Sequence, residues 1–333
     1  MGRTSLIFFH CITPLHNGAG QGLGAIDRPV IRESVTGYPF IQGSSIKGVL
    51  LAEVSLARGV DDSVVKATFG TGGTSGYQGC ATVTDAALLL LPVRSLAGTF
   101  VWATSRLALA RLARFLDVAE DHGPLRDAVA KVLKASSGLP KGSALGAERW
   151  PAAGDGEDPP KGPWDAAIRL DGKGPYCIEQ LVLEAQGGGA RGNVAELAVR
   201  LGEILFPEDG SEARFWKGFF KRRLLVLHDD DFRDLAQRAT HVEANIKIEA
   251  NGVTKDGSLR YTEYLPAETV LVSLLEQGRS NNGASPGAVA ALVDGVLSRP
   301  LQIGADESTG KGLVRVVHHK LEAAGQEAGH GES

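Results

Sequence analysis

Apolar residues along this chain switch between compact runs, as in buried strands, and a recurrence every three to four positions, as in helices. Residues 5–12 form a run of β-forming apolar side chains, and this run predicts an opening strand. Between residues 45 and 58 the apolar positions follow helical spacing, and Gly59 stands where a helix-capping glycine is expected. The pattern thus predicts strands and helices mixed along one chain.

The remaining segments follow the same two patterns. Further strands are expected at residues 38–41, 81–91, 224–227, 244–250, 263–273 and 313–317. Further helices are expected at residues 107–116, 125–134 and 194–205. This order favours an α+β fold, with strand, helix and strand at the start and strands with a helix at the end. A ferredoxin-like core with long insertions fits better than a doubly wound sheet, because the helices are irregularly spaced.

The composition bounds the class of protein. Hydrophobic residues make up 43% of the 333 positions, enough to bury a sizeable core in one large domain or two modest ones. The formal net charge is −4, so any contact with RNA must use a local basic face. The three cysteines are too few and too scattered for a disulfide framework or a zinc site. No apolar run approaches membrane-spanning length, so we expect a cytoplasmic protein with no membrane partner.

The segment TPLHNGAGQGLGAIDRPVIRESVTGYPFIQGSSIKG, residues 13–48, carries the most chemistry. Four glycines precede one isolated acid, Asp27, and two bases, Arg28 and Arg32, follow it. Glycines let a backbone approach a bulky ligand closely. The closing GSSIKG opens a helical pattern, and a helix start that carries serines and a lysine is a ready phosphate site. A carboxylate between these features predicts chemistry on a phosphodiester, with His16 within reach of Asp27 if the loop folds back.

The glycines and Asp27 also allow interpretations other than chemistry on a phosphodiester. The glycines do not complete a dinucleotide fingerprint, because the one permitted match is followed by Asp27 and Pro29 where a helix should begin. A P-loop ending at the Gly-Lys pair 310–311 fails at two positions of its pattern. Asp27 itself fits an ordinary polar turn beside Pro29.

Residues 245–266 (NIKIEANGVTKDGSLRYTEYLP) predict a β-hairpin that turns at Asn251-Gly252. An ordinary surface hairpin is the simpler interpretation. The functional interpretation is a projecting finger on which Lys255, Arg260 and the apolar residues contact a ligand.

Together these segments resemble the RAMP superfamily of CRISPR effector proteins and, within it, the backbone subunits of type III-B (Cmr) complexes. Four blocks that span the chain carry the resemblance, and the first two are specific. They are TPLHNGAGQGLGAIDRPVIRE with TGYPFIQGSSIKG, DAALLLLPVRSLAGTFVWATS, the hairpin ending in YTEYLP, and QIGADESTGKGLVRV. The type III-A (Csm) backbone subunits share the glycine loop and the acid, so they are the alternative within the superfamily.

The resemblance implies a ferredoxin-like or RRM-like palm with insertions and a projecting β-hairpin thumb. One domain would cover residues 1–320, with inserted helices near 100–210, the thumb near 244–266 and a disordered tail at 321–333. Copies of the chain would stack along one guide crRNA as a helical filament, beside other type III-B effector subunits. Each thumb would interrupt the duplex of guide and target RNA and splay out a nucleotide at regular intervals.

For the site, the resemblance implies an endoribonuclease that acts in the assembled complex, needs a divalent metal (Mg²⁺ or Mn²⁺) and leaves a 2′,3′-cyclic phosphate. The family's catalytic aspartate matches Asp27, which would also hold the metal, and its loop histidine matches His16. Its thumb glutamate matches Glu263, with Tyr261 nearby. The positions expected to bind RNA are Arg28, Arg32, Ser44, Ser45, Lys47, Arg94, Lys255, Gly310 and Lys311. A non-catalytic subunit that only packages guide RNA is the alternative from another class, and Asp27 speaks against it.

Overall fold

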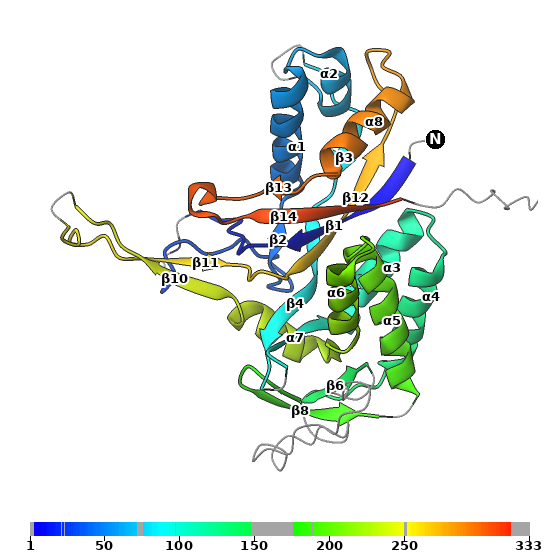
Figure 1. Ribbon diagram of the computed structural model, residues 1–333, viewed down its shortest axis with the longest axis vertical. Coiled ribbons are helices and arrows are strands. Elements are labelled where there is room, and N and C mark those ends of the chain that lie inside the picture. Colours follow the sequence, from blue (N-terminus) through cyan, green and yellow to red (C-terminus); the bar gives the residue numbers. More distant parts are fainter. Residues whose placement is uncertain are drawn as a thin grey trace, which may run out of the picture.

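The computed structural model describes residues 3–20, 22, 24–71, 76–96, 98–147, 176–187, 189–249 and 252–320 (Figure 1). Its strands are β1 (Arg3–Cys11), β2 (Phe40–Ile41), β3 (Ala81–Val83), β4 (Ala86–Arg94), β5 (Phe100–Ser105), β6 (Ser143–Gly146), β7 (Tyr176–Ile178), β8 (Leu181–Gln186), β9 (Leu224–Leu227), β10 (His241–Asn245), β11 (Arg260–Tyr264), β12 (Val270–Gln277), β13 (Leu301–Gln302) and β14 (Leu313–His319). Its helices are α1 (Gly43–Arg58), α2 (Ser63–Phe69), α3 (Arg106–Val118), α4 (Pro124–Ala135), α5 (Ala190–Leu205), α6 (Ser211–Lys221), α7 (Asp229–Arg238), α8 (Pro286–Leu297) and the short 3-10 helix η1 (Glu307–Thr309).

Four antiparallel strands form the palm, in the spatial order β14-β1-β12-β4. In chain order these are the fourth, first, third and second strands of the unit. The helix α1 lies between β1 and β4 in the chain, and α8 lies between β12 and β14. This order of strands and helices is that of a ferredoxin-like fold, so the expected α+β palm is confirmed.

Both faces of the palm sheet are buried, which explains the almost unbroken apolar sequence of β1. Leu6 and Phe8 pack in a core with α3, α4 and α5, whereas Ile7 and Phe9 pack with α1 and α8 on the opposite face. A strand that is covered on both faces has no solvent side for polar residues. The expected helix is confirmed as α1, which ends at Gly59 with a positive φ of 87°.

Beyond β4 the sheet continues through β5, β9, β6, β8 and β7. Helices α3, α4, α5 and α6 lie together on one side of this extension (Figure 1). They fall between Arg106 and Lys221, where the inserted helices were expected near residues 100–210. β5 and β9 are parallel neighbours, and parallel strands need a long crossover connection. The insertion therefore enlarges the palm sheet at one edge.

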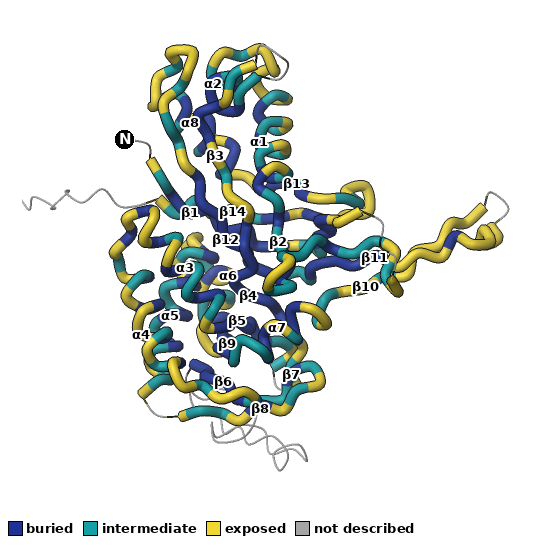
Figure 2. Tube along the Cα trace, turned by 180° about the vertical axis from the view of Figure 1, so that it is seen from behind, coloured by how far each residue is buried: buried dark blue, intermediate teal, exposed yellow. Residues whose placement is uncertain are grey.

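The hairpin β10–β11 projects from the body as a thumb (Figure 1). Its strands pair with His241 opposite Tyr264, and a further bridge joins Ile248 to Thr254 in the outer part. Asn251, expected at the turn, lies outside the described residues. Figure 2 shows that the outer part of the thumb is exposed on nearly all sides.

Two expected strands are each two strands in the structure, which corrects the sequence prediction. Residues 81–91 divide into β3 and β4, because the Asp85 carboxylate accepts a hydrogen bond from the first N–H of α1 (2.8 Å). Residues 263–273 divide into β11 and β12 at a turn that contains Glu268, whose φ is +71°. The strand β10 also begins and ends earlier than the expected 244–250.

Two parts of the expected domain organisation fall outside the described residues, namely residues 148–175 of the inserted region and the tail at 321–333. Cys11, Cys80 and Cys177 are free thiols, as the sequence indicated. In the described part of the chain, no helix is long and apolar enough to cross a membrane.

Candidate active site

The glycine-rich loop between β1 and β2 folds back on itself. The Ala19 N–H donates to the Pro29 carbonyl (3.0 Å), and the Gly22 N–H donates to the Asp27 carbonyl (2.9 Å). These bonds pair the two arms of the loop and leave the Asp27 side chain exposed near its end. The loop therefore presents Asp27 to solvent on a hydrogen-bonded support.

The same loop is joined to the base of the thumb. The Arg28 N–H donates to the Tyr261 carbonyl (3.1 Å), and the Glu263 N–H donates to the Arg28 carbonyl (3.0 Å). In addition, Asp27 Oδ2 accepts a hydrogen bond from the Tyr261 N–H (2.7 Å). Among the described residues, Oδ1 of Asp27 has no hydrogen-bond partner. The carboxylate is thus fixed through one oxygen and available through the other.

Glu263 lies beneath this loop and is 3% exposed. Its carboxylate accepts hydrogen bonds from the Val30 N–H (2.9 Å), from Arg32 Nη2 (2.5 Å) and from Thr240 Oγ1 (2.7 Å). Arg32 also donates to two backbone carbonyls and so is an internal residue. The sequence predicted Glu263 as catalytic and Arg32 as RNA-binding, and these contacts engage both side chains within the protein. The buried carboxylate of Glu263 and the half-buried guanidinium of Arg32 satisfy each other and so hold the loop in position.

His16 is also buried, with 3% of the residue exposed. Its Nδ1 forms a 2.7 Å hydrogen bond with the Glu263 carbonyl oxygen, so Nδ1 carries the proton of that bond. A Cβ atom at Gly18 would lie 2.6 Å from His16 Nε2, so glycine is required where the loop crosses the ring. His16 therefore supports the loop from below, whereas Asp27 is exposed on it.

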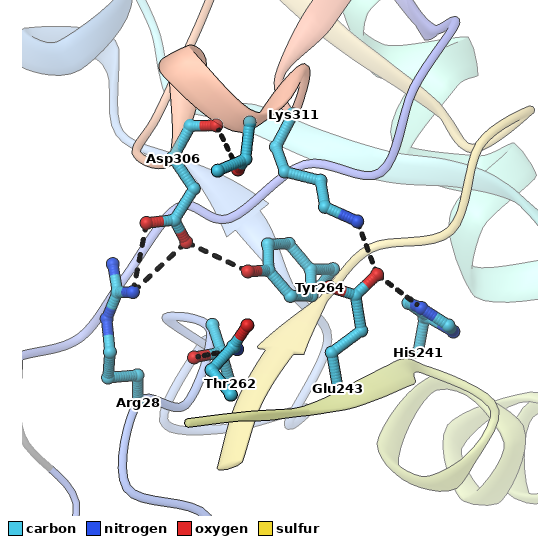
Figure 3. A network of polar contacts seen from close by, with 9 residues as sticks. Arg28, His241, Glu243, Thr262, Tyr264, Asp306 and Lys311 are labelled. Carbon is cyan, nitrogen blue, oxygen red and sulfur yellow. Dashed lines mark hydrogen bonds and ion pairs between the residues drawn. The ribbon is translucent and has the colours of Figure 1, made fainter. Parts of the chain in front are cut away.

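A polar network ties the loop and the thumb to the C-terminal loop that contains η1 (Figure 3). Arg28 Nη1 donates to both carboxylate oxygens of Asp306 (3.0 Å each), and the Tyr264 hydroxyl donates to Asp306 Oδ2 (2.9 Å). Burial acts to raise the pKa of Asp306, but the hydrogen bonds from Arg28 and Tyr264 outweigh it and leave this pKa below its usual range. Burial and the hydrogen bond to Asp306 raise the pKa of Tyr264 to about 12.

The second half of the network holds the thumb strand β10. Lys311 Nζ forms an ion pair with Glu243 and lies 4.8 Å from the centre of the Tyr264 ring. His241 contacts the same carboxylate at 2.9 Å. The hydrogen bond from Lys311 lowers the pKa of Glu243. Arg28 and Lys311, both expected to bind RNA, are thus paired with acids of the protein itself.

The start of α1 carries the expected phosphate-binding positions. Asp85 already occupies the Gly43 N–H, so the first donor of the helix is engaged. The N–H groups of Ser44 and Ser45 have no partner among the described residues, and unpaired N–H groups are normal at a helix start. Lys47 is half-buried on the same turn and forms no ion pair with a described residue. Two donors and one cation therefore remain available here.

A groove of about 860 Å³ lies beside this helix start. Its lining includes Asp85 and two arginines of α3, Arg111 and Arg114, which the sequence analysis missed. Arg111 pairs with Glu33 (2.9 Å), whereas Arg114 is exposed and has no ion-pair partner in the described chain. Their spacing of three residues on an amphipathic helix was the available signal.

The remaining expected RNA contacts lie apart from this groove. Arg94 pairs with Glu179 (2.6 Å) and lines a different cavity. Lys255 is exposed in the outer thumb. Gly310 ends η1 with a φ of +78° and so serves the turn that places Lys311.

The described side chains offer a divalent metal few protein ligands. In the described chain, no group of three or more acidic, histidine or cysteine side chains is placed to hold a metal. Mg²⁺ commonly keeps several waters and is bound by one or two carboxylates together with substrate phosphates. The exposed oxygen of Asp27 fits this second arrangement, in which RNA supplies further ligands.

The ferredoxin-like palm, the projecting thumb and the acid at the thumb base are the features of a RAMP protein. The family model of the RAMP superfamily matches residues 8–315, and the chain belongs to this superfamily. A curated relative, the CRISPR system Cmr endoribonuclease Cmr4 of Pyrococcus furiosus, is 30% identical over 322 residues. That match covers 94% of this chain and 95% of the relative.

Solved structures agree with this assignment. The crystal structure of oligomeric Cmr4 from Pyrococcus furiosus is 27% identical, with a TM-score of 0.63, and the match covers 97% of this chain and 99% of that one. A chain in the cryo-EM structure of the Type III-B Cmr-beta bound to cognate target RNA matches with a TM-score of 0.68 and 20% identity. That match covers 95% of this chain and 96% of the other, and at this identity it supports the fold alone.

Proposed function

We propose that this protein is the guide-RNA-binding backbone subunit of a type III-B CRISPR effector complex and cleaves target RNA at regular intervals. Copies stack along the guide in the cytoplasm beside other subunits of the complex. The endoribonuclease name and the oligomeric structure of its Cmr4 relatives support this proposal. The match to a Cmr protein over nearly the whole chain favours type III-B over type III-A.

The observation that carries the catalytic part is the Asp27 carboxylate. It is exposed, it is the acid of the glycine loop, and the thumb backbone fixes one of its oxygens at 2.7 Å. A fixed, exposed acid at the base of a projecting hairpin supports a role in cleaving a nucleotide that the hairpin splays out. A subunit that only packages guide RNA has no need of such a group.

Cleavage then follows from position and proton transfer. A nucleotide splayed out of the duplex allows its ribose 2′-oxygen to align with the adjacent phosphorus, which supplies much of the rate advantage. Oδ1 of Asp27 accepts the 2′-hydroxyl proton as the 2′-oxygen bonds to phosphorus. The bond from phosphorus to the 5′-oxygen breaks, and this oxygen takes a proton from solvent. The products are a 2′,3′-cyclic phosphate and a 5′-hydroxyl end.

The alternative role of the same Asp27 oxygen is to hold a divalent cation, in which case the 2′-hydroxyl proton would pass to solvent instead. When bound, Mg²⁺ or Mn²⁺ would neutralise charge on the phosphate. Arg28 is held by Asp306, so its charge lies beside the site without competing for the Asp27 oxygen. His16 and Glu263 act as positioning residues beneath the loop.

The guide is proposed to bind in the groove beside α1. Ser44 and Ser45 of the neighbouring helix start offer backbone N–H groups to phosphate, and Lys47 adds charge on the same turn. Arg114 adds charge from the groove wall. These contacts recognise the RNA backbone, so binding is indifferent to guide sequence.

The test is cleavage by the assembled complex. A labelled target complementary to the guide should give evenly spaced products with Mg²⁺ and none with a chelator. The subunit without guide should cleave poorly, because nothing then holds a target in register. Evenly spaced cleavage without guide, or unchanged cleavage in chelator, would contradict the proposal.

A further inference from the structure

The sequence of α6 and its end is unusual for this acidic protein. Residues 214–223 read RFWKGFFKRR, with five cations and four aromatic side chains. Acids are absent from the chain between Glu212 and Asp229. In a protein of net charge −4, this segment is a concentrated positive region.

The aromatic side chains of α6 form a connected cluster. Phe215, the outermost, is 57% exposed, and its ring centre lies 5.5 Å from those of Trp216 and Phe219. Trp216 stacks on Phe206 with an angle of 10° between the rings (5.8 Å). Phe220 alone on this helix is a fully buried aromatic residue and anchors it in the core. The cluster is therefore anchored in the core at Phe220 and accessible to solvent at Phe215.

Cations surround this cluster. Arg223 lies 3.6 Å above the Phe219 ring. Arg214, Lys221 and Arg222 are exposed and form no ion pair with another described residue. Elsewhere in this chain other exposed arginines do form ion pairs, as Arg238 does with Asp234 (2.9 Å). The charge of this patch is available to a ligand.

One residue links this cluster to the foot of the thumb. Phe100 packs against Phe219 (5.4 Å between ring centres) and also lines a cavity of about 460 Å³. The other walls of this cavity include the first residues of β10, His241 and Val242, together with Arg94 and its partner Glu179. The aromatic cluster of α6 therefore lies next to a cavity that reaches the thumb.

We propose that this surface, defined by Arg214, Phe215, Trp216, Phe219, Lys221 and Arg222, binds single-stranded RNA outside the duplex. The proposal rests on the proposed function only in that RNA is the partner. Half-exposed aromatic rings give bases a stacking platform, and interspersed cations pair with phosphates. A strand displaced at the thumb would pass onto this surface. A protein partner would need acidic side chains to match the three cations of this surface, whereas RNA supplies charge and flat rings together.

The first experiment is photo-crosslinking of an oligouridylate, about 15 nucleotides long, that carries 5-iodouridine. The purified protein is used without guide, so neither cleavage nor Asp27 enters the result. We expect crosslinks in the peptide that contains Phe215 and Trp216. Crosslinks confined to α1, α3 and the thumb would overturn the proposal.

The second experiment measures affinity for the same oligouridylate as a function of salt. Lys221→Ala with Arg222→Ala should reduce the slope of log affinity against log salt by about 1.4, which is two phosphate contacts on a single strand. Phe215→Ala should weaken binding about 5- to 10-fold, and Phe215→Tyr should retain it. The matched control removes two exposed cations elsewhere, Arg279→Ala with Arg299→Ala.

Three outcomes would overturn the proposal. If the control pair weakens RNA binding as much as the α6 pair does, the effect is one of net charge only. If the α6 variants leave RNA affinity unchanged, the patch does not bind RNA. If they change association between copies, measured by sedimentation, while RNA affinity stays intact, the patch is a protein interface.

Discussion

The base and the outer part of the thumb are built in opposite ways. At the base, Glu263, Tyr264 and Glu243 are each engaged by at least two other groups of the protein, and each is joined to at least one distant segment. In the outer part the apolar side chains of Ile248 and Val253 are exposed by 60% or more. The same hairpin is thus braced where it carries the Asp27 loop and left open where it extends into solvent.

This difference separates two tasks. The proposed catalytic carboxylate of Asp27 must be held within a fraction of an ångström, and the pair of half-buried Arg32 and buried Glu263 supplies that constraint. An element that interrupts a duplex needs reach and an exposed apolar surface instead. Changes at the base should therefore affect rate and stability, and changes in the outer part should affect where cleavage falls.

The largest effect is expected at Asp27. Asp27→Asn keeps the size of the side chain but removes the charge needed to accept a proton or bind a metal. Cleavage should fall by roughly 10²–10⁴, the range for loss of a positioned acid–base group. Guide loading and target affinity, measured by gel shift, should stay within a few-fold of the wild-type values. The cleavage rate is measured in single-turnover reactions of the same complexes. A near-normal rate would remove Asp27 from the mechanism and favour the packaging interpretation.

The next effect is expected at Glu263. Glu263→Gln leaves Arg32 half-buried without its counter-charge, so the free energy of unfolding should fall by about 2 kcal/mol. Cleavage should also fall, because the loop loses its anchor at the Val30 N–H. Denaturant unfolding of the variant and of the exposed control Glu276→Gln provides the comparison. Equal stability of the two variants would show that the base is not braced by this pair.

Tyr264 gives a smaller, pH-dependent effect. Its pKa is raised to about 12 in the folded state, so the stability contributed by the protonated hydroxyl is complete below about pH 10. This contribution is lost as the pH rises from about 10 through 12. At pH 8 the free energy of unfolding of the parent protein should exceed that of Tyr264→Phe by about 1 kcal/mol. This difference should disappear near pH 12.

The check on Tyr264 is denaturant unfolding of both proteins at several pH values. Tyr77→Phe serves as the control because Tyr77 lies outside the network of Figure 3. A difference between parent and Tyr264→Phe that stays constant up to pH 12 would show that the hydrogen bond to Asp306 is not what stabilises the base.

The smallest effect on rate is expected in the outer thumb. Replacing residues 247–257 by a tight Asn-Gly turn removes the exposed part and leaves β10 and β11. Total cleavage should change only a few-fold, while the product ladder loses its regular spacing. A sequencing gel of the products tests this, and an unchanged ladder would exclude the outer thumb as the element that sets the spacing.

The sequence predicted what depends on local pattern. The palm strands, α1 and the exposed acid of the glycine loop follow from periodicity and from glycine within short segments. It could not predict that Glu263 is buried, because its partner Arg32 lies 231 positions away in the chain. Arg28 and Lys311 likewise looked free in sequence, but folding pairs them with Asp306 and Glu243. Burial and pairing across the chain decide which charges remain for RNA.

The central claim is that each copy carries one complete cleaving site at its own thumb base. The most direct test assembles complexes from mixtures of wild-type and Asp27→Asn copies at several ratios, with one guide and one labelled target. We predict that every product band falls in linear proportion to the fraction of Asp27→Asn copies, with spacing unchanged and only residual cleavage in the pure variant. Bands that persist at full strength in the pure variant, or that fall with the square of the wild-type fraction, would contradict the claim.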